Sequence, residues 1–431
     1  MSKRASDGRA SYRRRKRAEM HAEAEAEQVQ LDDIADHPMV VVGRPELVTD
    51  VAGLESIAAH AREVGSFAYD TEFIGEETFH PRICLVQIAT AERLALIDPV
   101  EVPDLSPIFD VVADPAVETL VHDGAQDLEP VRRLTGREPG GIVDSQVCAA
   151  FLDMPWPSSL AKLVDRFCGH RLSKGHTFTD WDARPLTDRQ IRYAADDVRF
   201  LPLAWSRMKR ALVDAGRLDW AIRECDESRR RHVGQFDAEK QVRRIVRGSR
   251  VKTRVSTALF ALVELRHELA RELDLPHRVA MSDEGLLELA RSQPTDVGGV
   301  SNCRNVSKRT ATESGERIVA CIKAALEGPS RTLTGNKSRD ETAEDRMRID
   351  ALWSALSLRC LADGIAPTIM TSRSELGRWH LDRVDGRTDQ PLFEPGSWRA
   401  EAAGQWLESF LAGEGSLELG WSDGRLVRRG D

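Results

Sequence analysis

The chain has no regularly spaced set of cysteines and no long apolar run. Its seven cysteines are scattered over 431 residues without a Cys-x-x-Cys pair, which argues against a zinc site or a disulfide framework and indicates a reducing cytoplasm. No apolar run approaches the ~18 residues that a membrane-spanning helix needs, so no membrane partner is expected. The basic N-terminus is followed by alternating Ala and Glu rather than by an apolar segment, which predicts no secretory signal.

The chain also lacks an excess of basic residues. With 61 basic and 70 acidic side chains its net charge is -9, which is unusual for a protein that binds nucleic acid, because phosphate contacts come from Lys and Arg. Two stretches differ from this average: residues 3–17 hold eight basic side chains against one acid, and residues 226–254 hold ten against four. We expect a disordered arm and a linker there, either solvated or in contact with phosphates.

Two carboxylates interrupt the apolar, β-like run Phe67-Ala-Tyr-Asp-Thr-Glu-Phe73. A strand sends alternate side chains to opposite faces, so Asp70 and Glu72 project from one face about 7 Å apart. Burying paired carboxylates in a sheet is unfavourable unless a cation neutralises them, and a divalent metal is the usual solution. For this motif alone, the alternative is an edge strand with two solvated acids.

Two further acidic motifs follow. A short strand, Glu118–Val121, leads into a helix that carries Asp127 near its start. In the helical stretch 192–201, Tyr193 and Asp197 lie four residues apart, about 400° of rotation, and therefore on one face. Four acids and a tyrosine can supply two hard cations with oxygen ligands and leave positions open for phosphate and water.

Such a constellation suits the hydrolysis of a phosphodiester. Two cations about 4 Å apart clamp the attacking and leaving oxygens in line and stabilise the charge that develops between them. The Tyr193 hydroxyl, with an ordinary tyrosine pKa near 10, is a poor general base. We expect it to orient a metal-bound water, whose own pKa the metal lowers.

At these residues the chain resembles the ribonuclease D family of 3'-to-5' exonucleases, within the tyrosine-bearing subclass of the DEDD superfamily. The motifs that carry the resemblance are Asp70-Thr-Glu72, Gln126-Asp-Leu128, Ile142-Val-Asp-Ser-Gln146, Asp180-Trp-Asp-Ala-Arg-Pro-Leu186 and Tyr193-Ala-Ala-Asp-Asp197. They follow in the family's order, and the resemblance extends from about residue 45 to 425. The Trp-x-x-Arg-Pro-Leu segment that runs into Tyr-x-x-x-Asp is specific to ribonuclease D-like enzymes.

The resemblance implies roles for these residues. Asp70 would bridge two divalent cations, Mg²⁺ or Mn²⁺. Glu72 and Asp197 would hold the cation that carries the nucleophilic water, and Asp127 would hold the second. Family spacing selects Asp127 over Asp123, and likewise the second of two adjacent aspartates, 196 and 197, which helix geometry alone does not separate.

Five other side chains are candidates for contacts with the terminal nucleotide or with substrate phosphate: Phe73, Gln87, Lys174, Trp181 and Arg184. For Phe73 the alternative is packing in the core or the sheet. For Trp181 the alternative is that it anchors the following helix.

The pattern of elements predicts an α/β domain. We expect a first strand near 40–42, a helix over 50–64, and three strands from 70, over 82–90 and over 94–97. An antiparallel trio followed by alternating strands and helices gives a mixed sheet covered by helices. The resemblance specifies it as an RNase H-like exonuclease fold.

The second half reads as all-α. Apolar residues recur near a 3.6-residue period from Val255 to Leu273, Leu275-Pro276 ends that helix, and Ser282-Asp283 caps the next. Residues 253–328 and, more loosely, 345–425 resemble HRDC domains, the helical units shared by RecQ-type helicases and ribonuclease D. Such units either bind nucleic acid or brace the enzyme.

The expected organisation is a disordered basic arm (1–38), an exonuclease domain (39–225), a basic linker (226–252), an HRDC domain (253–328), a linker (329–344) and a second HRDC-like domain (345–425). The resemblance implies a cytoplasmic, metal-dependent 3'-to-5' exoribonuclease that releases nucleoside 5'-monophosphates from RNA with a free 3' end, such as a tRNA precursor. A DNA exonuclease of the same chemistry stays open, because the acids do not read a 2'-OH. A catalytically silent RNA-binding scaffold is the third alternative.

Overall fold

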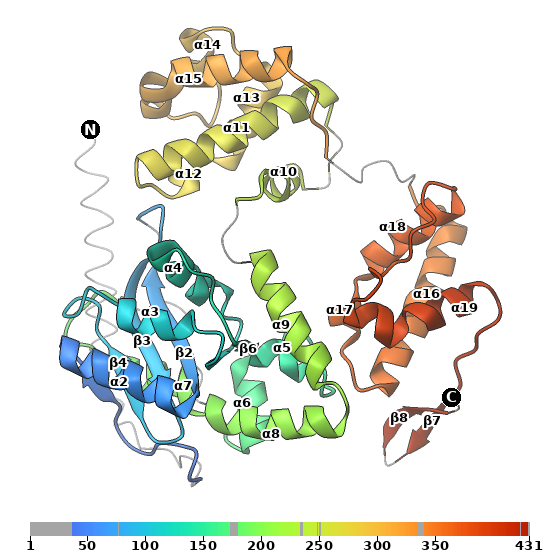
Figure 1. Cartoon of the computed structure of the whole chain (residues 1–431). Coiled ribbons are helices and arrows are strands. Elements are labelled where there is room, and N and C mark those ends of the chain that lie inside the picture. The colour runs from blue at the N-terminus through green and yellow to red at the C-terminus, as the bar shows by residue number, and fades with distance from the viewer. Residues whose placement is uncertain are drawn as a thin grey trace.

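A six-stranded mixed sheet dominates the first half of the chain (Figure 1). The computed structural model describes residues 37–75, 77–172, 180–232, 236–247, 249, 251–333, 340–422 and 424–429. The strands are β1 (Glu46–Val48), β2 (Ser66–Ile74), β3 (Arg82–Ala89), β4 (Leu94–Ile97), β5 (Glu118–Val121) and β6 (Ile142–Asp144), in the order β1-β4-β3-β2-β5-β6. β2, β3 and β4 are antiparallel and the remaining pairs are parallel, which confirms the mixed sheet.

The strand expected near residues 40–42 is wrong. Val40 is buried in a loop, Val42 is exposed, and Gly43 turns the chain with a φ of +95° before β1 begins. The expected helix over 50–64 is confirmed as α2 (Val51–Val64), which Asp50 caps by accepting a hydrogen bond from the Gly53 amide.

Helices cover both faces of the sheet. α2, α3 (Ser106–Val112) and α4 (Ala125–Thr135) pack with Phe67 and Tyr69 of β2 in one core. α7 (Asp188–Arg199) and α8 (Leu201–Asp214) pack on the other face, where Ala68 lies beside the two acids of β2. The other helices in the described part of this half are α5 (Ser145–Ala149), α6 (Leu160–Cys168) and α9 (Leu218–His232).

A separate core belongs to the unit that is expected to be an HRDC domain, called the HRDC unit below. Its helices are α10 (Ala238–Val246), α11 (Thr253–Glu272), α12 (His277–Ala280), α13 (Asp283–Ser292), α14 (Val297–Ser301) and α15 (Lys308–Glu327). The cap that Ser282 gives α13 is present. The linker expected over 226–252 is wrong for most of its length, since α9 runs to residue 232 and α10 follows. Val242, Ile245 and Val246 of α10, spaced i, i+3, i+4 among arginines, are buried against α11.

The last unit consists of α16 (Ala343–Ala362), α17 (Pro367–Met370), α18 (Arg373–Val384), a π-helical turn η1 (Ala400–Gly404), α19 (Gln405–Leu411) and the hairpin β7 (Leu419–Ser422) with β8 (Arg425–Arg428). The hairpin packs on α16. This unit was expected to be all-α, and it also contains these two strands. None of the helices in the described part of the chain combines the length and apolar character that crossing a bilayer requires.

This last unit shares its core with the sheet domain, as the neighbouring α9 and α17 in Figure 1 indicate. The Trp398 ring meets Phe151 edge-on at 4.7 Å between centroids. The Ala366 amide donates to the Ala150 carbonyl at 2.7 Å across the same contact. The second helical unit therefore braces the exonuclease domain.

Candidate active site

Three carboxylates converge at the end of β2. Asp70, Glu72 and Asp197 each offer an oxygen, and these oxygens lie within 4.8 Å of one another. Asp70 and Glu72 leave the same face of β2, as strand alternation predicts. Asp197 comes from α7, which packs across β2, β3 and β4.

The position of α7 follows from its own sequence. Its first turn is fixed by a capping box, in which Thr187 and Gln190 satisfy each other's backbone amides. Ala194, Ala195 and Val198 are buried against the sheet, which places the neighbouring side chains of Tyr193 and Asp197 at the rim of that contact.

Asp127 is the fourth acid of the cluster. It lies in the first turn of α4, is 7% exposed, and is close enough for its charge to raise the pKa values of Asp70 and Glu72. The structure thus brings together Asp70, Glu72, Asp127 and Asp197. Asp123 is instead exposed.

The adjacent Asp196 is occupied elsewhere. It pairs with Arg199 at 3.3 Å, whereas Asp197 faces the other carboxylates. The structure therefore shows that Asp197, and not Asp196, belongs to the carboxylate cluster, a choice that helix spacing alone does not make.

The acids of the cluster lie close together and are largely shielded from water, which makes their ionised forms unfavourable. Burial, reinforced by the other carboxylates, raises the pKa of Asp70 well above its usual value and that of Glu72 to about 8. Burial and the charge of Asp196 raise the pKa of Asp197 to about 7. A bound cation would favour the ionised form of these carboxylates and so lower their pKa values. A set of hard oxygen donors fits a divalent metal.

Tyr193 adjoins this cluster. Burial and the nearby carboxylates raise the pKa of its hydroxyl, which therefore stays protonated at neutral pH and donates a hydrogen bond to Asp197. The residue is 36% exposed. Its protonated hydroxyl suits the positioning of a water molecule better than the role of a base.

Arg184 is not available to bind substrate. Its five N–H groups donate to the Asp98 carboxylate, at 2.5 and 2.7 Å, and to the carbonyl oxygens of Cys84, Trp181 and Ala183. Because a guanidinium has only five donors, none is left for a phosphate, and the expected contact is wrong.

Three other expected contacts can be placed. Trp181 is 7% exposed and packs with Ile191 in a small core, which favours its anchoring role. Gln87 is completely buried, and neither polar atom of its side chain has a hydrogen-bond partner, so its expected contact with the terminal nucleotide stays a prediction. Phe73 is half-buried beside a strand irregularity at the end of β2. The expected contact by Lys174 lies outside the described residues.

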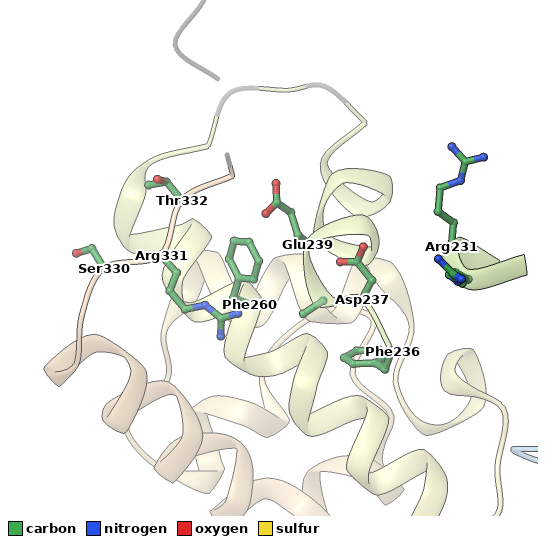
Figure 2. Close-up of a pocket in the computed structure, with 10 residues that line it drawn as sticks. Arg231, Phe236, Asp237, Glu239, Phe260, Ser330, Arg331 and Thr332 are labelled. Atoms are coloured by element: carbon green, nitrogen blue, oxygen red, sulfur yellow. The ribbon is translucent and has the colours of Figure 1, made fainter. Parts of the chain in front are cut away.

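A polar cavity of about 670 Å³ lies where α9 ends and the HRDC unit begins. Figure 2 shows Arg331 beside Phe260 on one side and Arg231, at the end of α9, on the other. The Arg331 guanidinium lies 4.4 Å from the centre of the Phe260 ring, a cation–π contact. Arg230 also lines the cavity, so three cationic side chains from two units border one space.

Comparisons with known proteins match the architecture. Residues 45–212 match the family model of the 3'-5' exonuclease, and residues 257–322 match that of the HRDC domain. The chain is 30% identical to ribonuclease D of Gluconacetobacter diazotrophicus over 388 residues, which cover 89% of this chain and 96% of that protein. It is 28% identical to ribonuclease D of Escherichia coli, over 85% of this chain and 98% of that protein.

Solved structures agree with this. The crystal structure of Escherichia coli RNase D, described as an exoribonuclease involved in structured RNA processing, aligns with a TM-score of 0.72 and 27% identity over 87% of this chain and all of that one. The catalytic core of RRP6 from Trypanosoma brucei shares the fold, with a TM-score of 0.52 and 21% identity over 71% of this chain and 88% of that one. By its sequence, its domain order and its fold, this chain belongs to the ribonuclease D family of 3'-5' exonucleases.

Proposed function

We propose that this chain hydrolyses RNA from the 3' end and releases nucleoside 5'-monophosphates, using two divalent cations, Mg²⁺ or Mn²⁺, held by Asp70, Glu72, Asp127 and Asp197. The observation that carries the proposal is the convergence of three carboxylates within 4.8 Å, with a fourth beside them. When bound, such cations supply charge stabilisation for the attacking and leaving oxygens.

The side chains divide the remaining work. Asp70 shares the cluster with Glu72 and Asp197 and is also influenced by the charge of Asp127, which supports a role for it as the ligand that bridges two cations. The protonated hydroxyl of Tyr193, which is bonded to Asp197, would orient the attacking water. Tyr193 thus positions the nucleophile and leaves its deprotonation to other groups.

The proposed substrate is RNA with a free 3' end, such as a tRNA precursor, processed in the cytoplasm. The related protein of Escherichia coli is described as acting in structured RNA processing. The cavity between α9 and the HRDC unit is lined by three arginines together with Asp237 and Glu239, and these arginines would contact a phosphate backbone away from the catalytic acids.

The test is digestion of 5'-labelled single-stranded RNA and DNA of one sequence, with Mg²⁺, with Mn²⁺ and with EDTA. We expect RNA to shorten from its 3' end with either metal, and EDTA to stop the reaction. Preferential digestion of DNA would replace the RNA assignment with that of a DNA exonuclease. Binding of RNA without cleavage of either polymer, at any metal concentration, would show a silent scaffold.

A further inference from the structure

Asp127 lies beside an edge of β2 where strand pairing stops. β5 pairs with β2 over Ser66–Ala68, and the chain then turns into α4. Further along the same edge, the Thr71 backbone amide donates to Oδ1 of Asp127 at 3.1 Å. The Asp127 carboxylate therefore accepts a β2 amide hydrogen bond that a longer partner strand would otherwise accept.

Side chains of β2 hold the same aspartate. The Thr71 hydroxyl donates to Oδ1 of Asp127 at 2.5 Å, and the Tyr69 hydroxyl donates to the Asp127 carbonyl oxygen at 3.2 Å. Tyr69 is 1% exposed and Thr71 4% exposed, so these bonds form away from water. A hydrogen bond to a carboxylate is stronger than one between two neutral groups. A buried polar group that loses its hydrogen bond lowers the stability of the fold.

Thr71 contributes both of its donors to a single oxygen. The amide and the hydroxyl of Thr71 both end on Oδ1, while Asp127 also lies near enough to raise the pKa of Asp70 on the other face of the strand. The two donors hold Oδ1 at the strand edge, the carboxylate also accepts a hydrogen bond from its own backbone amide, and Oδ2 makes no bond to Thr71.

We infer that Thr71 is a positioning residue, which fixes the carboxylate of Asp127 so that Oδ2 is presented to a divalent cation beside Asp70. This inference rests on the proposed function, because it deepens the account of the same site. Partners of metal ligands orient those ligands, and their loss typically lowers metal affinity about 10- to 100-fold.

A packing role for Thr71 makes a different prediction. β-branched residues are favoured in strands whatever their polarity, and Val has nearly the shape of Thr. If Thr71 only fills space, Thr71→Val is neutral and Thr71→Ser, which loses the methyl group, is the harmful change. If Thr71 positions Asp127, the order is reversed.

The experiment measures Mn²⁺ binding to the full-length protein by calorimetry, in the absence of RNA. We expect Thr71→Val to weaken binding of the Mn²⁺ that Asp127 would hold about 10- to 100-fold, and Thr71→Ser to bind Mn²⁺ as the wild type does. Thr119→Val is the matched control. Thr119 is a buried threonine of the adjacent β5 whose hydroxyl has no hydrogen-bond partner, so its replacement should leave Mn²⁺ binding unchanged.

Thermal unfolding of each variant shows whether the fold survives; if Thr71→Val does not fold, Thr71→Ala removes the same hydroxyl and takes its place. Wild-type Mn²⁺ affinity in Thr71→Val, or an equal loss in Thr71→Ser, would overturn the inference. If the wild type itself neither binds Mn²⁺ nor shortens RNA, the proposed function fails instead, so the two failures are distinguishable.

Discussion

Asp70 is the residue on which the chemistry depends most, because it faces the other three acids of the cluster. We expect Asp70→Asn to lower the rate of RNA cleavage by about 10³-fold or more, since an amide cannot balance the charge of two cations. Asp123→Asn is the control: Asp123 is exposed, lies one turn from Asp127 and should keep full activity. Activity of Asp70→Asn close to that of the wild type in saturating Mg²⁺ would contradict the assignment.

A substitution at Tyr193 tests whether its hydroxyl orients the attacking water. Tyr193→Phe should lower kcat about 10²-fold with little change in the Mg²⁺ concentration needed for half-maximal rate, if the hydroxyl orients water. A large rise in that concentration would show that the hydroxyl supports the cation site through its bond to Asp197.

The four acids also make stability depend on pH when no metal is present. Glu72 has a pKa of about 8 in the folded chain against an ordinary value of 4.5, so the native state holds a proton that the unfolded chain releases. The free energy of unfolding in EDTA should therefore fall as pH rises from about 4.5 to about 8. Mg²⁺ requires the ionised acids, so its stabilising effect should grow over the same range. Melting temperatures of the wild type and of Glu72→Gln, in which the dependence should weaken, check this.

Single residues could be predicted from the sequence where spacing alone limits the geometry. Strand alternation brings Asp70 and Glu72 to one face, and α-helical spacing brings Tyr193 and Asp197 together. The environment of Arg184 was not predictable, because its partner Asp98 is 86 positions away and joins it only through tertiary packing. The position of Thr71, a hydrogen-bonding residue between two acids, is visible in the sequence. Its pairing with Asp127 on α4 is not, because it arises only from tertiary packing.

At the scale of elements, α9 is the most consequential. Its Glu224 is 2% exposed, lies against Arg399 at 2.8 Å, and accepts a hydrogen bond from the Trp398 indole at 2.7 Å. Burial raises the pKa of Glu224, but the bonds and the charge of Arg399 outweigh it, and the net pKa is lowered. α9 is therefore joined to the second helical unit by a buried, ionised carboxylate.

Removing Arg399 should leave the charge of the buried Glu224 carboxylate only partly compensated, by Arg231 at 2.5 Å. We expect Arg399→Ala to lower the free energy of unfolding by about 3–5 kcal/mol. The control is Arg223→Ala, which breaks a neighbouring pair with the more exposed Glu401 and should change stability by at most about 1 kcal/mol. Urea unfolding of both variants measures the difference, and equal effects would contradict the view of Glu224 as a buried anchor.

Elements were predictable in proportion to the strength of their periodicity. α11, with twenty residues of regular apolar spacing, was predicted almost to its ends. α10 was missed because three apolar residues among arginines read as a charged linker, and only contact with α11 shows that they are buried. The hairpin of β7 and β8 has four-residue strands and packs on α16, so its sequence carries little signal of its own.

For the whole molecule, the two helical units have different relations to the sheet domain. The second unit completes the core of the exonuclease domain, so ending the chain after residue 225 would expose apolar surface around Phe151. The HRDC unit has its own core. Its recorded ties to the sheet domain include the Phe79 amide, which donates to Asp274 at 3.1 Å, and the Phe79 ring, 5.3 Å from that of His277. Point variants in the full chain are therefore the cleaner test of where RNA is held.

Arg230 is the side chain best suited to that test. It lines the cavity between α9 and the HRDC unit, is 69% exposed, and pairs with Asp226 in the preceding turn of α9. If it contacts an RNA phosphate, Arg230→Ala should weaken binding of a tRNA precursor and lower the slope of log affinity against log salt by about 0.7, because one fewer counterion is released. Arg348→Ala removes a similarly exposed arginine with a similar helical pair on α16 and should change neither value. The cleavage rate at saturating RNA should stay constant in both, since the acids of the site are untouched. If Arg230→Ala and Arg348→Ala give the same affinity and the same salt slope, RNA does not pass through this cavity, and the HRDC unit serves the enzyme through its contacts with the loop around Phe79 instead.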